Sequence, residues 1–112
     1  MGITIREVNS VADIEKIIEI CRPEVKALSE LKDYRKKYFT ESGENKNTFI
    51  AFPDTILMAE YNGRLVGYLH FYEDCYEGYE KVLVSLNTIP LLFREDAEKV
   101  KQKLEEEFRY WA

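Results

Sequence analysis

The segment Thr55–Tyr72 reads TILMAEYNGRLVGYLHFY and carries the strongest structural signal in the chain. Two runs of aliphatic, β-branched and aromatic residues flank the dipeptide Asn62-Gly63. An Asn-Gly pair in this setting favours the two-residue turn that joins antiparallel strands, because both residues tolerate a positive φ. The sequence therefore predicts a β-hairpin made of strands 55–61 and 64–72.

The residues before this hairpin predict one strand and a first helix. Ile3–Val8 alternates apolar and polar residues, which is the period of a half-buried strand. Ser10 and Asp13 have the spacing of a helix N-terminus, because a hydroxyl accepts hydrogen bonds from the first turn and a carboxylate favours its positive end. The apolar face of this helix consists of Val11, Ile14, Ile17, Ile18 and Cys21.

A second helix is expected to start at Pro23, since proline suits the first turn of a helix but cannot continue one. Its apolar stripe is Val25, Leu28, Leu31 and Tyr34 or Tyr38. The polar segment Thr40–Asn47 is expected to be a loop, and Phe49–Phe52 a short extended piece before the turn at Pro53.

The residues after the hairpin predict a loop, a strand and a helix. Glu73–Tyr79 is expected to be a connecting loop, and the β-rich segment Lys81–Ile89 a fourth strand that ends at Pro90. A final amphipathic helix is indicated by Ala97, Val100, Leu104, Phe108 and Trp111.

The predicted class is α/β of the α+β type, with the order β-α-α-β-β-β-α. We expect a central, mostly antiparallel four-stranded sheet flanked by three helices, in a single domain of residues 1–112.

Composition and charge limit which binding partners and which cellular location are expected. Lys and Arg number 16 and Asp and Glu 21, which gives a net charge of -5 and makes nucleic acid a poor partner. No apolar run is long enough to span a bilayer, and the N-terminus lacks the pattern of a secretory signal, so a cytoplasmic protein that binds no membrane is expected. Cys21 and Cys75 form no CxxC pair and are expected to stay reduced, and a single histidine, His70, argues against a metal site.

Two stretches resemble the GNAT acetyltransferase superfamily. The hairpin ILMAEYNGRLVGYLHFY matches the family's strand, glycine turn and second strand with a V-G-Y-like step, here Val66-Gly67-Tyr68. The segment LVSLNTIPLLFR resembles the strand, proline and arginine that lead into the family's coenzyme A loop. The resemblance covers nearly the whole chain and implies the family's fold for the part that is present.

The resemblance also implies where acetyl-coenzyme A would bind and shows departures from the family pattern. The family's glycine-rich pyrophosphate loop corresponds to Arg94–Lys99 (REDAEK), which has no glycine and holds three carboxylates at a helix end that a pyrophosphate would need. If coenzyme A binds, the matching residues are Leu86, Thr88 and Arg94. Ser85 and Asn87 stand where many members carry a carboxylate base, and the family's last strands and helix are missing, so no catalytic residue is assigned.

Other candidate residues have simpler interpretations. Arg94 is expected to pair with the neighbouring carboxylates, and His70 to pack in its strand or lie at the surface. The acids around Cys75 raise rather than lower a thiol pKa. The basic run Lys32–Tyr38 is expected to be the solvated face of a helix.

The sequence favours a non-catalytic GNAT-like binding or regulatory module that acts through protein–protein contacts. The fourth strand is expected to form a sheet edge that pairs with a partner protein or a second copy, with a homodimer as the expected state. The loop after the hairpin mixes tyrosines with acids, which suits protein recognition and equally suits a hairpin end with half-buried tyrosines. The predicted partner-binding residues are Tyr72, Asp74, Tyr76, Tyr79, Val82, Val84 and Leu86.

Two other functions remain open from the sequence. One is an N-acetyltransferase that uses acetyl-coenzyme A with a divergent loop and is completed by a second subunit. The other is a small acidic inhibitor, of the kind encoded by mobile genetic elements, that occupies a basic groove with its acids and tyrosines.

Overall fold

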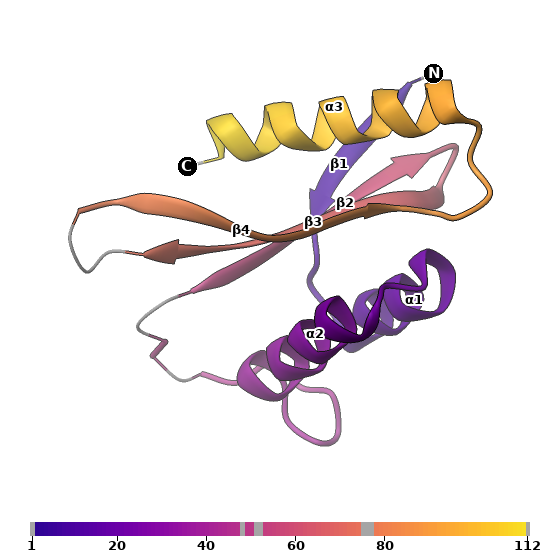
Figure 1. Ribbon diagram of the computed structural model, residues 1–112. Coiled ribbons are helices and arrows are strands. Elements are labelled where there is room, and N and C mark those ends of the chain that lie inside the picture. The colour runs from indigo at the N-terminus through magenta and orange to yellow at the C-terminus, as the bar shows by residue number, and fades with distance from the viewer. Residues whose placement is uncertain (1, 48, 51–52, 75–77, 112) are drawn as a thin grey trace.

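The computed structural model describes residues 2–47, 49–50, 53–74 and 78–111. Its elements are β1 (Ile3–Glu7), α1 (Val11–Cys21), α2 (Val25–Tyr38), β2 (Asp54–Tyr61), β3 (Arg64–Asp74), β4 (Glu80–Thr88) and α3 (Arg94–Tyr110). Helices α1 and α2 cover one face of the sheet and α3 covers the other (Figure 1). The predicted α+β class, with three helices around a four-stranded antiparallel sheet, is confirmed.

The four strands lie side by side in chain order, β1-β2-β3-β4, and each neighbouring pair is antiparallel. The predicted hairpin forms β2 and β3, with Met58 directly opposite Tyr68. Asn62 and Gly63 form its turn with φ of 51° and 75°, which is the positive φ that the Asn-Gly pair predicts.

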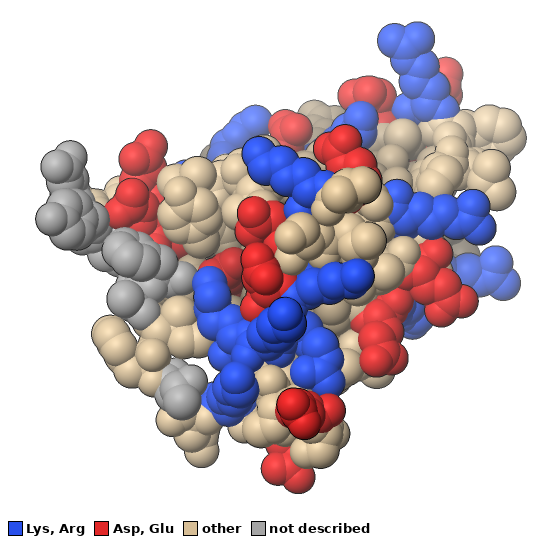
Figure 2. Space-filling model, turned by 60° about the horizontal axis from the view of Figure 1, so that its bottom comes forward, with Lys and Arg blue, Asp and Glu red and all other residues tan. Residues whose placement is uncertain are grey.

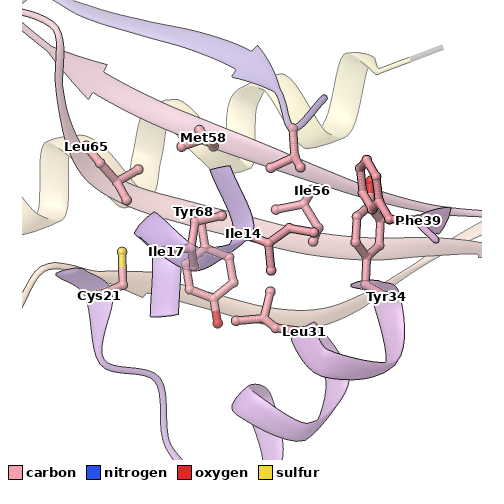
Figure 3. Close-up of a cluster of buried hydrophobic side chains, with 11 residues drawn as sticks. Ile14, Ile17, Cys21, Leu31, Tyr34, Phe39, Ile56, Met58, Leu65 and Tyr68 are labelled. Carbon is pink, nitrogen blue, oxygen red and sulfur yellow. The ribbon is translucent and has the colours of Figure 1, made fainter. Parts of the chain in front are cut away.

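Two hydrophobic clusters hold the helices on the two faces of the sheet. Strand residues Ile56, Met58 and Tyr68 meet α1 and α2 residues such as Ile17 and Leu31, and their side chains point toward one another in Figure 3. On the other face, the fully buried Leu57, Leu69, Phe71, Val100 and Leu104 join α3 to the sheet. Alternate residues of one strand thus serve different layers, as the pleat of a strand requires.

The first helix begins and ends as local chemistry dictates. Ser10 Oγ accepts a hydrogen bond from the Asp13 amide at 3.2 Å, which confirms the predicted N-terminus. Proline disfavours the right-handed helical conformation for the residue before it, and Arg22 ends α1 in a left-handed conformation with φ of 46°. Helix α2 begins at Val25 rather than at Pro23, because the first carbonyl to accept a helical hydrogen bond is that of Glu24.

Two local predictions differ from the structure. Phe49 and Ile50 are not in a strand, whereas Ala51 and Phe52 lie outside the described residues. Glu73 and Asp74 belong to β3 rather than to a loop, because they pair with Lys81 and Glu80 of β4. Among the described residues, no helix is long and apolar enough to cross a membrane.

Candidate functional site: the edge strand and its hairpin end

Strand β4 lies at one edge of the sheet and pairs with β3 alone among the described residues. It is nine residues long, and the end it shares with β3 projects past the helices (Figure 1). A strand at an edge presents unpaired backbone donors and acceptors on its outer side, which is the geometry that lets another strand add to a sheet. The predicted sheet edge is therefore present.

A break in register divides the side chains of β4 between the two faces of the sheet. The pairing shifts between His70 and Phe71, so that Ser85 lies opposite His70 whereas Leu83 lies opposite Phe71. Val84 is consequently the extra residue of a bulge. Bulges bend and twist a strand, so the outer edge of β4 consists of two short stretches rather than one straight template.

The bulge changes the surroundings of the three apolar residues predicted at this edge. Leu86 lies opposite Leu69 and packs against the cluster under α3. Val82 lies opposite Tyr72 and therefore faces the side of α1 and α2. Val82 and Val84 are both half-buried. Leu83, which the sequence did not single out, is the exposed apolar residue of the strand, with 49% of its surface accessible.

The hairpin end contains most of the other predicted partner-binding residues. Tyr79 is 61% exposed, and its hydroxyl donates a hydrogen bond of 2.9 Å to Glu73 Oε1. Asp74 lies directly opposite Glu80, and Tyr72 directly opposite Val82. The structure thus brings Tyr72, Asp74, Tyr79 and Val82 together at one end of the sheet. Tyr76 and Cys75 lie outside the described residues.

Lys81 ties the hairpin end to the C-terminus of α3. Its ammonium donates hydrogen bonds to the carbonyl oxygens of Phe108, Arg109 and Trp111, and it lies 5.3 Å from the centre of the Phe108 ring. A cation at the C-terminal end of a helix satisfies carbonyls that have no helical partner and opposes the negative end of the helix dipole. The one lysine of β4 is therefore directed toward α3.

The residues expected to contact coenzyme A lie around the connection from β4 to α3. Thr88 is the last residue of β4, and Arg94 is the first residue of α3 and is exposed. Within the described part of the chain, Arg94 makes no ion pair, so its predicted pairing with local acids is not formed. The first turn of α3 carries Glu95 and Asp96, which disfavours an anion at this helix end.

Ser85 and Asn87 form a polar group with a buried tyrosine. Ser85 Oγ and Asn87 Nδ2 each donate a hydrogen bond of 3.2 Å to the Tyr68 hydroxyl oxygen. Burial raises the pKa of Tyr68, while these two hydrogen bonds act in the opposite direction. None of the three carries a carboxylate, so the group offers no general base at neutral pH.

A second buried polar group, which the sequence did not reveal, contains the single histidine. His70 is fully buried, and its Nε2 lies 2.8 Å from Asp54 Oδ2. Lys37 Nζ donates to the other carboxylate oxygen at 2.9 Å, and the Tyr38 hydroxyl oxygen accepts from the Asp54 amide at 2.5 Å. Of the two environments expected for His70, packing within the strand is the one observed.

The charge of Asp54 follows from these contacts. Burial alone raises the pKa of a carboxyl group, but the hydrogen bonds from His70 and Lys37 outweigh burial and lower the pKa of Asp54. His70 Nδ1 is buried without a hydrogen-bond partner in the structure. The group joins α2 to strands β2 and β3, and it runs from the fully buried His70 to the partly exposed Lys37.

No group of three or more His, Cys, Asp or Glu side chains suited to a metal ion occurs among residues 2–47, 49–50, 53–74 and 78–111.

Comparison of the chain with protein-family models, with curated proteins and with solved structures finds no match. The site is therefore characterised by its own geometry: an edge strand, a projecting hairpin end and two buried polar groups behind them.

Proposed function

We propose that this chain is a non-catalytic binding or regulatory module that acts through protein–protein contacts at β4 and the β3–β4 hairpin end. The observation that carries the proposal is the position of β4, which among the described residues has a neighbouring strand on one side only and still carries an exposed leucine. Partner proteins commonly recognise such edges by adding a strand, with pockets for alternate side chains.

The polar groups near β4 support a non-catalytic role. The hydroxyl and amide of Ser85 and Asn87 are engaged with Tyr68, and His70 is fully enclosed. The first turn of α3 is acidic where a bound pyrophosphate would need positive charge. A cytoplasmic setting is part of the proposal, and the buried free thiol of Cys21 fits a reducing compartment.

A relationship to the GNAT superfamily remains part of this proposal. Its support is the hairpin sequence around Asn62-Gly63 together with an element order of one strand, two helices, three strands and a helix. On this view the protein keeps the scaffold of the family and uses it for binding. The alternative within the same family is an N-acetyltransferase that binds acetyl-coenzyme A near Leu86, Thr88 and Arg94.

A calorimetric titration with acetyl-coenzyme A, combined with light scattering for the molar mass, separates these two functions. The binding module predicts no heat and, in its self-associating form, a dimeric mass that falls in the Leu83→Arg variant. The matched control is Thr4→Arg on the opposite edge strand β1, which should leave the mass unchanged. Micromolar binding of acetyl-coenzyme A would contradict the non-catalytic proposal.

A further inference from the structure

The C-terminal half of α2 and the turn after it form a basic surface on an acidic chain. The segment 32–47 has five Lys and Arg against three Asp and Glu, a net charge of +2, whereas the whole chain has a net charge of -5 and the remainder therefore -7. Figure 2 shows Lys and Arg side chains gathered on the face that α1 and α2 present. The cations of this basic surface are Lys32, Arg35, Lys36, Lys37 and Lys46.

A tight turn after α2 brings one of these cations back beside the helix. Phe39 pairs with Asn45 in an isolated antiparallel bridge. The Lys46 amide donates a hydrogen bond of 2.9 Å to the Tyr38 carbonyl oxygen, and its Nζ donates one of 2.5 Å to the Lys36 carbonyl oxygen. The turn thus places the Lys46 ammonium against the last turn of α2.

Hydrogen bonds hold two of the cations in place without neutralising them. The Arg35 guanidinium donates to the carbonyl oxygens of Thr40 and Glu41 at 3.0 and 3.1 Å, and Lys46 also binds a carbonyl oxygen. A main-chain carbonyl carries no net charge. Arg35 and Lys46 are therefore positioned by the turn and remain able to attract an anion.

The charge of the basic surface is only partly compensated. Among residues 2–47, 49–50, 53–74 and 78–111, its one ion pair joins Lys37 Nζ to Asp54 at 2.9 Å. Lys32 and Lys36 are exposed and lie four residues apart on α2, and like charges at that spacing repel each other. An anion bound at this surface would relieve the repulsion.

The cations border a hollow with a buried aromatic side chain in its wall. The hollow has a volume of about 690 Å³, within the usual range of ligand sites, and is lined by Arg35, Lys36, Phe39, Thr40, Glu41 and Lys46. Phe39 is buried, so it offers a fixed apolar contact beside three cations and one anion. A carboxylate on a short apolar stem fits this combination, and Asp and Glu side chains have that form.

We infer that the basic surface binds a short acidic segment of a partner protein, with carboxylates lying among Arg35, Lys36 and Lys46. Charge complementarity carries this inference, because positive groups held in place without anionic partners face solvent on a protein that is acidic elsewhere. The surface belongs to α2 and its turn, so the inference does not depend on the proposed use of β4.

The distribution of charge favours an acidic peptide over a nucleic acid. A nucleic acid carries negative charge along its whole backbone, so a strand that crosses the basic surface continues over a protein whose remainder has a net charge of -7. Screening limits exposed charges to about 8 Å at physiological ionic strength, so a short peptide meets chiefly the local cations. Exposed ion pairs are individually weak, and the binding should therefore be weak and sensitive to salt.

Fluorescence anisotropy with a dye-labelled oligoglutamate peptide tests the inference. The unaltered chain should bind this peptide at low salt and lose affinity as salt is added, whereas an oligoglutamine peptide with the same dye should not bind. Lys36→Glu removes an attraction and adds a repulsion, so it should raise the dissociation constant by about tenfold.

The matched control is Lys26→Glu, which makes the same change of charge at an exposed residue of the same helix. It lies about 15 Å from Lys36 along α2, which exceeds the screening length of about 10 Å at 0.1 M salt. At that salt concentration, Lys26→Glu should change the dissociation constant by less than about twofold.

A third variant should increase affinity, which a misfolded protein cannot do. Glu41→Gln removes the one anion that lines the hollow and leaves the main-chain carbonyl that binds Arg35. It should lower the dissociation constant by about twofold to fivefold. Circular dichroism of each variant establishes that it is folded.

Three results would overturn the inference. The first is a folded, unaltered chain that does not bind the oligoglutamate peptide at low salt. The second is an equal loss of affinity in Lys36→Glu and Lys26→Glu, which would show an effect of net charge rather than of this surface. The third is tighter binding of an oligothymidylate of equal charge, lost in Lys36→Glu alone, which would assign the surface to nucleic acid. Each of them leaves the proposed use of β4 untouched.

Discussion

The two edges of the sheet, β1 and β4, differ in how they are protected. Strand β1 has five residues, and Arg6 lies within it with ion pairs of 2.7 Å to Asp13 and to Glu60. Strand β4 has nine residues, begins at the projecting hairpin end and exposes Leu83. Short strands and charged side chains are the usual means of preventing edge-to-edge association. The β1 edge is therefore protected against association by charge and short length, whereas the β4 edge is protected mainly by its bulge.

The ion pairs of β1 also connect this edge to the layer of α1. Arg6 donates to both carboxylate oxygens of Asp13, at 2.9 and 2.7 Å, and Asp13 also accepts from the Asn9 amide at 3.1 Å. Lys81 has the corresponding role for β4, but it binds main-chain carbonyls of α3. Arg6 thus holds the β1 edge through the carboxylate of Asp13, which acid can protonate, whereas Lys81 holds the β4 edge through main-chain carbonyls of α3. The two edges can therefore be tested separately, by acid and by loosening α3.

The largest effect is expected from loosening α3. Leu104 is fully buried in the cluster between α3 and the sheet, so Leu104→Ala should lower the free energy of unfolding by about 2–5 kcal/mol. The control is Leu91→Ala, which alters a side chain that is 95% exposed and should change stability by less than about 0.5 kcal/mol. Chemical denaturation measures both.

Leu104→Ala should also reduce the protection of β4 against hydrogen exchange more than that of β1. Because α3 supplies the carbonyls that hold Lys81, amide hydrogen exchange in Leu104→Ala should accelerate more in β4 than in β1. Equal acceleration in both strands would show that α3 does not hold the β4 edge selectively.

A smaller effect is expected at the contact between β3 and β4. A Cβ atom at Gly67 would lie 2.8 Å from Val100 Cγ1 and 2.9 Å from the Asn87 carbonyl oxygen. A main-chain atom cannot yield as a side-chain end can, so Gly67→Ala should cost about 1–3 kcal/mol and displace β4. Gly2→Ala is the control, because a Cβ there meets no atom within 4 Å. Equal melting temperatures for the two variants would refute this account.

Local signals in the sequence predict the fold better than they predict the site. The Asn62-Gly63 turn and the Ser10 helix start depend on neighbouring residues, and both are confirmed. The bulge at Val84 and the contact of His70 with Asp54 depend on pairing between distant segments, and the sequence does not reveal them. One signal for His70 was available, since it shares a strand face with Tyr68, which the apolar pattern places inside.

The smallest expected effect tests the protected edge through its dependence on pH. The hydrogen bonds from Arg6 lower the pKa of Asp13, against the effect of burial. A lowered folded-state pKa contributes stability that is present above the unfolded value of about 3.9 and is lost as the pH falls through the folded value. Because Arg6 is partly exposed, this contribution should be about 0.5–1 kcal/mol at neutral pH.

Arg6→Gln should remove this contribution, so its free energy of unfolding should fall less steeply below pH 4 than that of the unaltered chain. Some acid sensitivity should persist, because the pKa of Asp54 is also lowered and its partners are unchanged. Arg64→Gln at the exposed start of β3 is the matched control and should leave the pH profile unaltered. If Arg6→Gln and the control give the same profile, charge does not stabilise the β1 edge, and its short length is what distinguishes it from β4.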